Sequence, residues 1–357
     1  MLSIGIVGLP NVGKSTLFNA LTKSKQADAQ NYPFCTIEPN VGVVEVPDAR
    51  LAGLATAEQS KKIIPTAIEF WDIAGLVKNA SKGEGKGNDF LSHIKETDAI
   101  IHVVRAFRDD NIIHVEQRVN PKDDADIINL ELVLADWQAV SSRLDKTKKR
   151  AKGIQAKELA AEIALLEKVS AHLESGKRAS ALSYTEEEAL IMKELHLITM
   201  KPMLYVVNID DVQLSATERP IVEEGVPHIY ISAKTEAELG ELSAEDAAIF
   251  MEDLGMKESG LDTMIKAGYE LLGLVTFFTA GEMETRAWTV KQGTKAPFAA
   301  GEIHTDFIKG FIKADVVHHT DFVSHGGWSG IKGTGKMRLE GKEYIVQDGD
   351  VVYFHIA

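Results

Sequence analysis

The first part of this 357-residue chain contains a segment that can bind phosphate, Gly8-Leu-Pro-Asn-Val-Gly13-Lys14-Ser15. The segment fits G-x-x-x-x-G-K-[ST] between an apolar run at 3–7 and a helical pattern at 15–21, which is the context that a phosphate-binding loop requires. Glycines let backbone N–H groups approach phosphate oxygens, the lysine stabilises the β- and γ-phosphates, and the serine hydroxyl binds Mg²⁺. We expect these residues to bind nucleotide, with Lys14 also acting in catalysis: Asn11, Val12, Gly13, Lys14, Ser15 and Thr16.

A carboxylate at the end of another predicted strand supports a magnesium site. Asp72-Ile-Ala-Gly75 follows the apolar run at 68–71, and an aspartate in that place reaches Mg²⁺ through water while the glycine N–H faces the γ-phosphate. Thr36 lies in the loop before the next strand, where its hydroxyl completes the Mg²⁺ shell when a γ-phosphate is present. The predicted metal ligands are therefore Ser15, Thr36 and Asp72.

A third motif follows the strand predicted at 203–207 and reads Asn208-Ile209-Asp210-Asp211. The order of the three motifs resembles the TRAFAC class of P-loop GTPases, which read guanine with N-K-x-D. Asn208 and Asp211 hold the first and last positions, but Ile209 replaces the lysine whose stem lies along the base. Since isoleucine cannot supply that contribution, and Asp211 alone is a poor guanine clamp, we expect ATP to be preferred over GTP.

Across essentially its whole length the sequence resembles the YchF family, the Obg-like ATPases. The segments that carry the resemblance are Gly8-Leu-Pro-Asn-Val-Gly-Lys-Ser-Thr, Asn31-Tyr-Pro-Phe-Cys-Thr-Ile-Glu-Pro-Asn, Asp72-Ile-Ala-Gly-Leu-Val, Val103-Val-Arg-Ala-Phe, Asp110-Asn-Ile-Ile-His-Val and Gly301-Glu-Ile-His-Thr-Asp-Phe. The resemblance implies a preference for ATP, because the base-reading motif of that family is N-x-x-E with an apolar second position against adenine.

In terms of this chain, the resemblance places Ile209 on one side of the adenine and Phe107 on the other. Ser232 and Ala233, after the strand predicted at 228–231, resemble the loop that supports the base from behind. The chain departs from the family at Asp211, where the family usually has Glu and a guanine reader has Asp. The sequence therefore leaves two interpretations of Asp211 open: it belongs to an adenine site or to a guanine site.

The residues expected to catalyse hydrolysis also come from the resemblance. Ras-like enzymes orient the attacking water with a glutamine after D-x-x-G, and Leu76 occupies that position here, so we expect slow intrinsic turnover. The histidine that the family is suggested to use instead maps onto His114, whose imidazole can accept a proton near pH 7. The alternative is a structural histidine beside Ile112 and Ile113. Cys35 precedes Thr36 and is either a redox-sensitive position or an inert thiol.

Buried parallel strands are needed to position these residues. The runs at 3–7, 41–46, 66–71, 99–105, 203–207 and 228–231 are apolar and continuous, as in a parallel sheet covered on both faces. We therefore predict an α/β fold: a P-loop NTPase domain at 1–134 and 198–275, with a mostly parallel sheet. An inserted helical hairpin is predicted at 135–197, where apolar residues recur at steps of three and four.

Two further segments suggest partners. Residues 143–157 contain seven Lys or Arg and a single Asp, so the predicted hairpin tip is a basic probe for ribosomal RNA or merely a solvated helix end. Residues 276–357 are rich in short strands, predicted at 284–290, 315–317, 343–346 and 351–355, and resemble a TGS domain, a β-grasp module that interacts with RNA or protein. The expected partner is the ribosome, through its large subunit.

Composition limits the remaining choices. The formal net charge is −14, the hydrophobic fraction is 45%, and there is one cysteine, which excludes an internal disulfide and a multi-cysteine zinc site. We expect a cytoplasmic protein without membrane insertion, and a monomer. Two function classes stay open: a slow, Mg²⁺-dependent ATPase whose nucleotide state switches a ribosome-binding surface, and an adaptor that binds ribosomes or proteins regardless of nucleotide. An Obg-type translational GTPase is a variant of the first.

Overall fold

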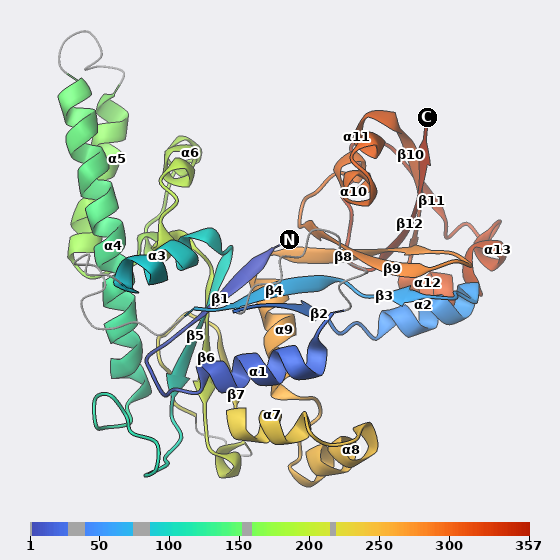
Figure 1. Ribbon diagram of the computed structural model, residues 1–357. Helices are drawn as coiled ribbons and strands as arrows, with labels where there is room; N and C mark the ends of the chain where they lie inside the picture. The colour runs from blue at the N-terminus through green and yellow to red at the C-terminus, as the bar shows by residue number, and fades with distance from the viewer. Residues whose placement is uncertain (1, 28–39, 74–85, 152–158, 215–218) are drawn as a thin grey trace. The chain divides into compact units, whose positions relative to one another are not determined.

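The computed structural model describes residues 2–27, 40–73, 86–151, 159–214 and 219–357 (Figure 1). Contacts between residues divide the chain into two compact units. The first contains residues 1–24, 36–42 and 69–264, and the second contains residues 25–35, 43–68 and 265–357. Each unit contains most of one six-stranded sheet, and the unit boundaries fall within two strands of the first sheet, Val41–Glu45 and Ala67–Asp72.

The sheet of the first unit has the strand order β2-β4-β1-β5-β6-β7. The strands are β1 (Ser3–Val7), β2 (Val41–Glu45), β4 (Ala67–Asp72), β5 (Ala99–Arg105), β6 (Met203–Asn208) and β7 (His228–Ile231). β1 pairs in parallel with both β4 and β5, and β5–β6 and β6–β7 are also parallel. Every residue of β1, β5 and β6 is buried, which explains why their sequences are mainly apolar. The predicted α/β fold with a mostly parallel sheet is confirmed.

The segments that carry the predicted site residues follow the carboxyl ends of β1, β5, β6 and β7, before the next helices begin. The helices of this unit outside the hairpin are α1 (Lys14–Lys25), α3 (Lys86–Glu96), α6 (Glu186–Glu194), α7 (Ala233–Leu239) and α8 (Ala244–Asp253), and α9 (Gly260–Leu271) runs from the first unit into the second. α1 begins directly after the glycines of the first motif, and α7 begins after Ser232, whose hydroxyl caps it by accepting from the N–H of Thr235.

The predicted hairpin consists of α4 (Pro121–Arg150) and α5 (Ala160–Glu174), which lie side by side in Figure 1. α4 starts before residue 135 because Asn120 caps it, accepting from the N–H of Asp123, and Pro121 opens its first turn. The hairpin core is Val133, Val140, Leu165, Leu166, Val169 and Leu173, with Trp137 and Leu144 packed against it. Leu130, an apolar residue of α4, is 50% exposed and is not part of this core. None of the described helices is long and apolar enough to cross a membrane.

One buried carboxylate joins the hairpin to the sheet. Asp136 of α4 is 1% exposed and accepts hydrogen bonds from the N–H groups of Ile198 and Thr199, at 2.9 and 2.7 Å, just before β6. Burial raises the pKa of Asp136, and the bonds from Thr199 and Ile198 oppose that rise. The insertion is therefore tied to the strand that leads into Asn208.

The sheet of the second unit has the order β11-β10-β12-β8-β9-β3. Its strands are β3 (Ile63–Ile64), β8 (Leu274–Ala280), β9 (Thr285–Lys291), β10 (Phe311–His318), β11 (Arg338–Glu340) and β12 (Asp350–Ile356). Helices α10 (Ala296–Ile303), α11 (Asp306–Gly310), α12 (His319–Ser324) and α13 (Gly327–Ile331) lie between them in sequence. The strand predicted at 343–346 is wrong: this stretch makes one isolated bridge, between Ile345 and Lys295, because a turn at 341–344 leads into it.

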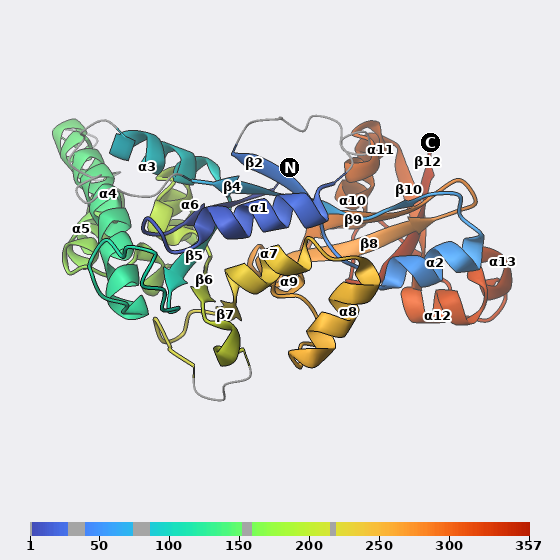
Figure 2. The ribbon, with the colours of Figure 1, turned by 60° about the horizontal axis from the view of Figure 1, so that its bottom comes forward.

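Residues 43–68 belong by contact to this second unit, although their position in the sequence suggests the first domain. β3 pairs in parallel with β9, with Ile63 opposite Thr285. Helix α2 (Arg50–Glu58) lies beside α12 and α13 (Figure 2), and its Leu54 is buried with Phe278 and Phe322. Residues 43–68 therefore contribute an edge strand, β3, and part of the core to a unit whose other described residues are 25–27 and 265–357.

Candidate nucleotide-binding site

The loop between β1 and α1 has the geometry of a phosphate-binding loop. Gly13 has φ +98°, and a Cβ there would lie 2.2 Å from Nδ2 of Asn208, so the position requires glycine. A Cβ at Gly8 would lie 2.4 Å from the carbonyl oxygen of Val103. The two glycines of the motif thus allow close backbone approach at both ends of the loop.

Lys14 lies at the start of α1 with its ammonium directed back into the loop. Nζ donates to the carbonyl of Leu9 at 3.1 Å, and the residue is 7% exposed. Burial lowers the pKa of Lys14, and the nearby Asp72 carboxylate opposes part of that shift. A buried ammonium group beside a helix N-terminus provides positive charge that can bind the phosphate groups of a polyphosphate.

The predicted metal ligands Ser15 and Asp72 meet in the structure. Ser15 Oγ donates to Asp72 Oδ2 at 3.0 Å. The second carboxylate oxygen, Asp72 Oδ1, is buried and has no hydrogen-bond partner among the described residues. A hydroxyl and a carboxylate with a spare oxygen fit Mg²⁺, which takes oxygen ligands and bound water. Thr36 and Gly75 lie outside the described residues, as do Cys35 and Leu76.

Asn208 connects the phosphate loop to the base side of the site. It is 4% exposed at the end of β6, its Nδ2 donates to the carbonyl of Val12 at 2.9 Å, and its Oδ1 accepts from the N–H of Ala233 at 3.0 Å. The carbonyl of Asn208 also accepts from the N–H groups of Ala106 and Phe107. One side chain and its own backbone therefore hold together three loops that come from β1, β5 and β7.

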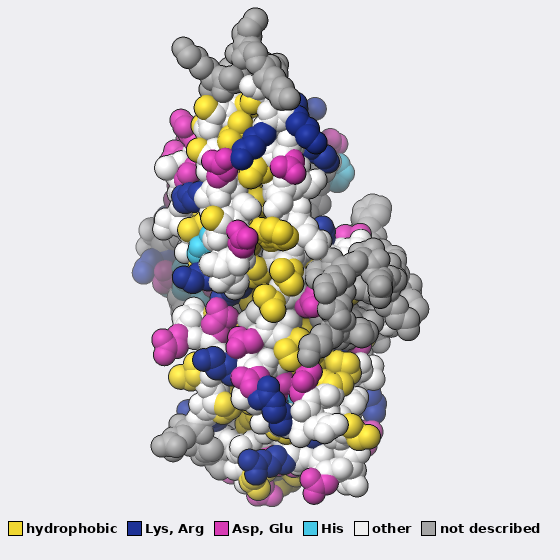
Figure 3. Space-filling model, turned by 90° about the vertical axis from the view of Figure 1, so that its left-hand side faces the viewer, with side chains coloured by type: hydrophobic (Ala, Val, Ile, Leu, Met, Phe, Trp, Pro, Cys, Tyr) yellow, Lys and Arg dark blue, Asp and Glu magenta, His cyan; other side chains and the backbone are white. Residues whose placement is uncertain are grey.

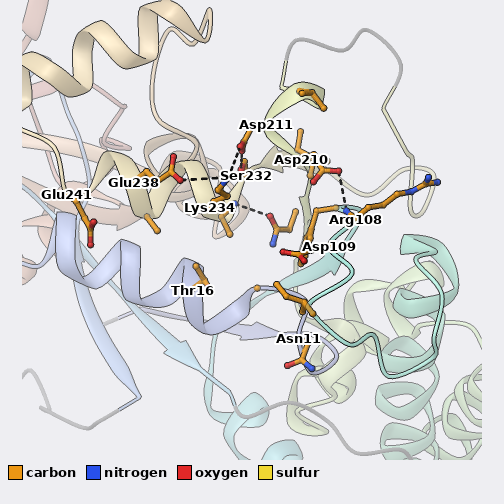
Figure 4. Close-up of a pocket in the computed structure, with 18 residues that line it drawn as sticks. Asn11, Thr16, Arg108, Asp109, Asp210, Asp211, Ser232, Lys234, Glu238 and Glu241 are labelled. Carbon is orange, nitrogen blue, oxygen red and sulfur yellow. Dashed lines mark hydrogen bonds and ion pairs between the residues drawn. The ribbon is translucent and has the colours of Figure 1, made fainter.

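A cavity of about 960 Å³ opens between these loops (Figure 4). The predicted nucleotide-binding residues that line it are Asn11, Gly13, Thr16, Phe107, Asn208, Ile209, Asp211, Ser232 and Ala233. Ile209 is 2% exposed, so its side chain forms part of a packed apolar wall. The cavity is large enough for a nucleoside triphosphate and combines apolar walls with a phosphate loop.

Asp211 is held by the first turn of α7. Its Oδ1 accepts from Ser232 Oγ at 2.5 Å, and its Oδ2 lies 3.6 Å from the ammonium of Lys234 (Figure 4). The same Oδ1 also accepts from Thr235 Oγ1 at 2.6 Å. Burial alone raises the pKa of Asp211, but the hydrogen bonds from Ser232 and Thr235 and the charge of Lys234 outweigh it, so the net shift is downward. The carboxylate stays ionised, with one oxygen fully engaged by the protein.

His114 lies in the segment between β5 and α4, with both ring nitrogens engaged. Nδ1 accepts from the N–H of Glu116 at 3.1 Å, so Nε2 carries the proton and donates to Asp124 Oδ2 at 2.8 Å. The side chain is 5% exposed, whereas the neighbouring Ile113 is 78% exposed. In this arrangement the imidazole cannot take a proton from water.

The segment with His114 nevertheless lies beside the phosphate loop, because Asn11 Nδ2 donates to the carbonyl of Ile113 at 3.0 Å. Sequence reasoning did not single out Asp124 as a partner of His114, although an aspartate in the first turn of a helix is a common feature. It also missed Arg108 and Asp210 at the cavity, where the N–H of Arg108 donates to Asp210 Oδ2 at 3.2 Å.

Comparison with known proteins agrees with this geometry. Residues 3–136 match the family model of a 50S ribosome-binding GTPase. Residues 274–357 match YchF-GTPase_C, described as a protein of unknown function (DUF933). A Bacillus subtilis protein named ribosome-binding ATPase YchF is 54% identical over 99% of this chain and 98% of its own length. The chain belongs to the YchF family.

Other comparisons support this membership. The Escherichia coli O157:H7 protein of the same name is 50% identical over 98% of each chain. The solved structure of the Schizosaccharomyces pombe YchF GTPase has a TM-score of 0.89 and 38% identity, and it covers 99% of this chain and 97% of that one. The YchF architecture expected from sequence is thus confirmed, whereas the roles of single site residues stay predictions.

Proposed function

We propose that this chain is a ribosome-binding, Mg²⁺-dependent ATPase of the YchF type, a P-loop switch that prefers ATP to GTP. The observation that carries the proposal is one cavity that the phosphate-loop residues Asn11, Gly13 and Thr16 line together with the apolar Ile209. Lys14 and Ser15 lie next to these lining residues in the same loop region, and Ser15 is bonded to Asp72. The curated relatives are named ribosome-binding ATPases, and hydrolysis of the β–γ phosphoanhydride is the corresponding reaction.

In the proposed mechanism the chain mainly positions the triphosphate and stabilises its charge. The N–H groups from Asn11 to Thr16 bind phosphate oxygens, and the ammonium of Lys14 leaves the Leu9 carbonyl to neutralise charge that develops on the β–γ bridge. Ser15 and Asp72, with Thr36, would hold Mg²⁺, which supplies further neutralisation of the phosphates when bound. In this mechanism the N–H of Gly75 donates a hydrogen bond to the γ-phosphate.

His114 is proposed to orient the attacking water, in place of the glutamine that Leu76 replaces. Because Asp124 and the Glu116 N–H occupy both of its nitrogens, His114 must leave this arrangement before it can act. The need for such a rearrangement agrees with the slow intrinsic turnover that we expect from the sequence.

The preference for ATP rests on the apolar base wall. Ile209 offers no charge or hydrogen bond to guanine, and Phe107 and Ala233 complete an apolar slot suited to adenine. Asp211 has one oxygen engaged by Ser232 and Thr235, which leaves only Oδ2, itself near Lys234, for the base. A translational GTPase is the alternative if that single oxygen suffices to bind guanine.

Ribosome binding is proposed to use the hairpin tip. At the end of α4, Lys146, Lys149 and Arg150 are exposed and form no ion pair with any described residue, whereas Lys148 pairs with Glu167 at 2.7 Å. Lys and Arg side chains are visible at that end of the hairpin in Figure 3. Exposed cations at the end of a helical pair fit the phosphates of ribosomal RNA, and the TGS-like second unit offers another contact. We further propose a large-subunit site, a cytoplasmic location and a monomer.

Phosphate release from ATP and from GTP, measured with Mg²⁺ and with EDTA, tests this function. We expect ATP-selective, Mg²⁺-dependent release, and about 100-fold slower turnover in His114→Ala with unchanged nucleotide affinity, as for loss of a general base. Near-normal turnover in His114→Ala contradicts its catalytic role. Co-sedimentation with ribosomes in ATP, in ADP and without nucleotide separates the switch from the adaptor: equal binding in all three supports the nucleotide-independent adaptor.

A further inference from the structure

The last residue of β5, Arg105, has one of the largest fully buried side chains among the described residues, with 2% exposure. It stands at the point where the central sheet passes into the segment that carries Phe107 and His114. Among the described residues, no carboxylate lies within 4.0 Å of its guanidinium, so it has no ion-pair partner there. Burying a cation without an opposite charge is costly, so its hydrogen bonds must be well formed.

Among the residues that the structure describes, the hydrogen bonds of the guanidinium go to backbone carbonyls of the following segment. Nε donates to Phe107 at 3.2 Å, Nη2 to Asp109 at 3.1 Å and Nη1 to Ile112 at 2.9 Å. A planar fork of donors can satisfy three carbonyls that point inward from one loop, which a single ammonium cannot do with the same geometry. The path of residues 107–112 is therefore fixed from inside by one side chain.

The same guanidinium supports the ring of Phe107. The carbon at the centre of the guanidinium lies 4.2 Å from the centroid of that ring, within the range of a cation–π contact. Phe107 lines the cavity together with Asp109 and Ile112, so all three residues whose carbonyls bind Arg105 are also cavity residues. The backbone of Phe107 is held on its other side, by the carbonyl of Asn208 at 3.0 Å.

We propose that Arg105 is a positioning residue for base recognition: it holds Phe107 and its loop as the wall against which adenine packs. The inference rests on the proposed function, because it requires that Phe107 contacts the base. Arg105 is buried behind the wall and reaches the nucleotide only through that loop. Its loss therefore weakens the hold on the base and leaves the phosphate loop intact.

The test uses the full chain and two competitors, ATP and inorganic tripolyphosphate, against a fluorescent ADP analogue with Mg²⁺. In Arg105→Lys we expect ATP to bind about tenfold more weakly, the effect of about 1.4 kcal/mol, while tripolyphosphate binds within about twofold of wild type. Arg118→Lys is the matched control, since Arg118 lies in the same segment but is exposed and pairs with Asp123. It should bind both competitors as wild type does.

A double-mutant cycle identifies the residue through which Arg105 acts. If Arg105 acts through Phe107, adding Arg105→Lys to Phe107→Ala should cause less than about twofold further loss of ATP affinity, because coupled residues are not additive. Phe107→Leu, which keeps an apolar side chain but removes the aromatic face, should by itself reproduce the selective loss of ATP. That variant preserves the test if Arg105→Lys does not fold.

Parallel losses of ATP and tripolyphosphate would show that Arg105 merely supports the fold, and unchanged ATP binding in Arg105→Lys or Phe107→Leu would also overturn the inference. Full additivity in the cycle would place its action elsewhere. A wild-type protein that does not bind ATP would instead refute the proposed function itself, and the two failures are thus separate.

Discussion

Asn208 connects the phosphate loop to the first turn of α7 and also lines the nucleotide cavity, so its removal should damage the whole site. Its side chain makes two buried hydrogen bonds, to the carbonyl of Val12 and from the N–H of Ala233, at 2.9 and 3.0 Å. Each bond contributes about 1 kcal/mol net, so Asn208→Ala removes about 2 kcal/mol that holds the phosphate loop against the α7 turn. Since the nucleotide must then order both loops on binding, we expect ADP to bind about 30-fold more weakly.

Displacement of a fluorescent ADP analogue measures this loss, and a thermal unfolding curve checks that the variant is folded. Asn111→Ala is the matched control, because Asn111 is exposed and its side chain bonds, within the described parts of the chain, to nearby Asp109. A folded Asn208→Ala protein that binds ADP within about twofold of wild type, well inside a loss of 1 kcal/mol, would refute the reasoning that this side chain organises the site.

Three further predictions follow from single contacts. His102 is 1% exposed in β5, and burial, with the charge of Lys14, lowers its pKa to about 3. Above the unfolded pKa of about 6.5 the neutral ring stabilises the fold, and this contribution is lost between pH 6.5 and 3 by up to about 1.4 kcal/mol per pH unit. In urea denaturation, His102→Phe should lose less unfolding free energy over that pH range than the wild type. The same dependence of unfolding free energy on pH in both proteins would contradict the prediction. Asp72→Ala should raise the Mg²⁺ concentration needed for ATP binding about tenfold, and Mg²⁺-free binding should not change. Lys146→Glu, Lys149→Glu and Arg150→Glu should each lower the slope of log ribosome affinity against log salt concentration by about one unit per lost phosphate contact. Lys148→Glu should lower that slope least, because Lys148 is already paired with Glu167.

Local sequence patterns predicted the parts of the fold that depend on neighbours in the chain. β1, β5 and β7 have the bounds read from their apolar runs, and α1 starts where the phosphate loop ends. The phosphate loop between β1 and α1 could be recognised because each required residue, from Gly8 to Ser15, lies within one strand–loop–helix unit. Asn208 and Ile209 were found for a similar reason, since they directly follow a buried strand.

Contacts between distant segments were not visible in the sequence. β3 is two residues long and pairs with β9, so nothing local marks residues 43–68 as part of the second unit. The chemistry of His114 depends on Asp124, which is reached only because α4 begins at Pro121 and turns its first residues toward the loop. Arg105 ends the strand predicted at 99–105, but its three carbonyl partners are set by the fold of the following loop, which the sequence does not reveal.

The central claim, an ATP site built on a P-loop, is tested most directly by equilibrium competition between unlabelled ATP and GTP for a fluorescent ATP analogue with Mg²⁺. We predict that ATP competes at least about tenfold more tightly than GTP, a difference of about 1.4 kcal/mol, because Ile209 and Phe107 form an apolar slot. Equal or tighter competition by GTP would contradict that claim and show that Asp211 decides the base.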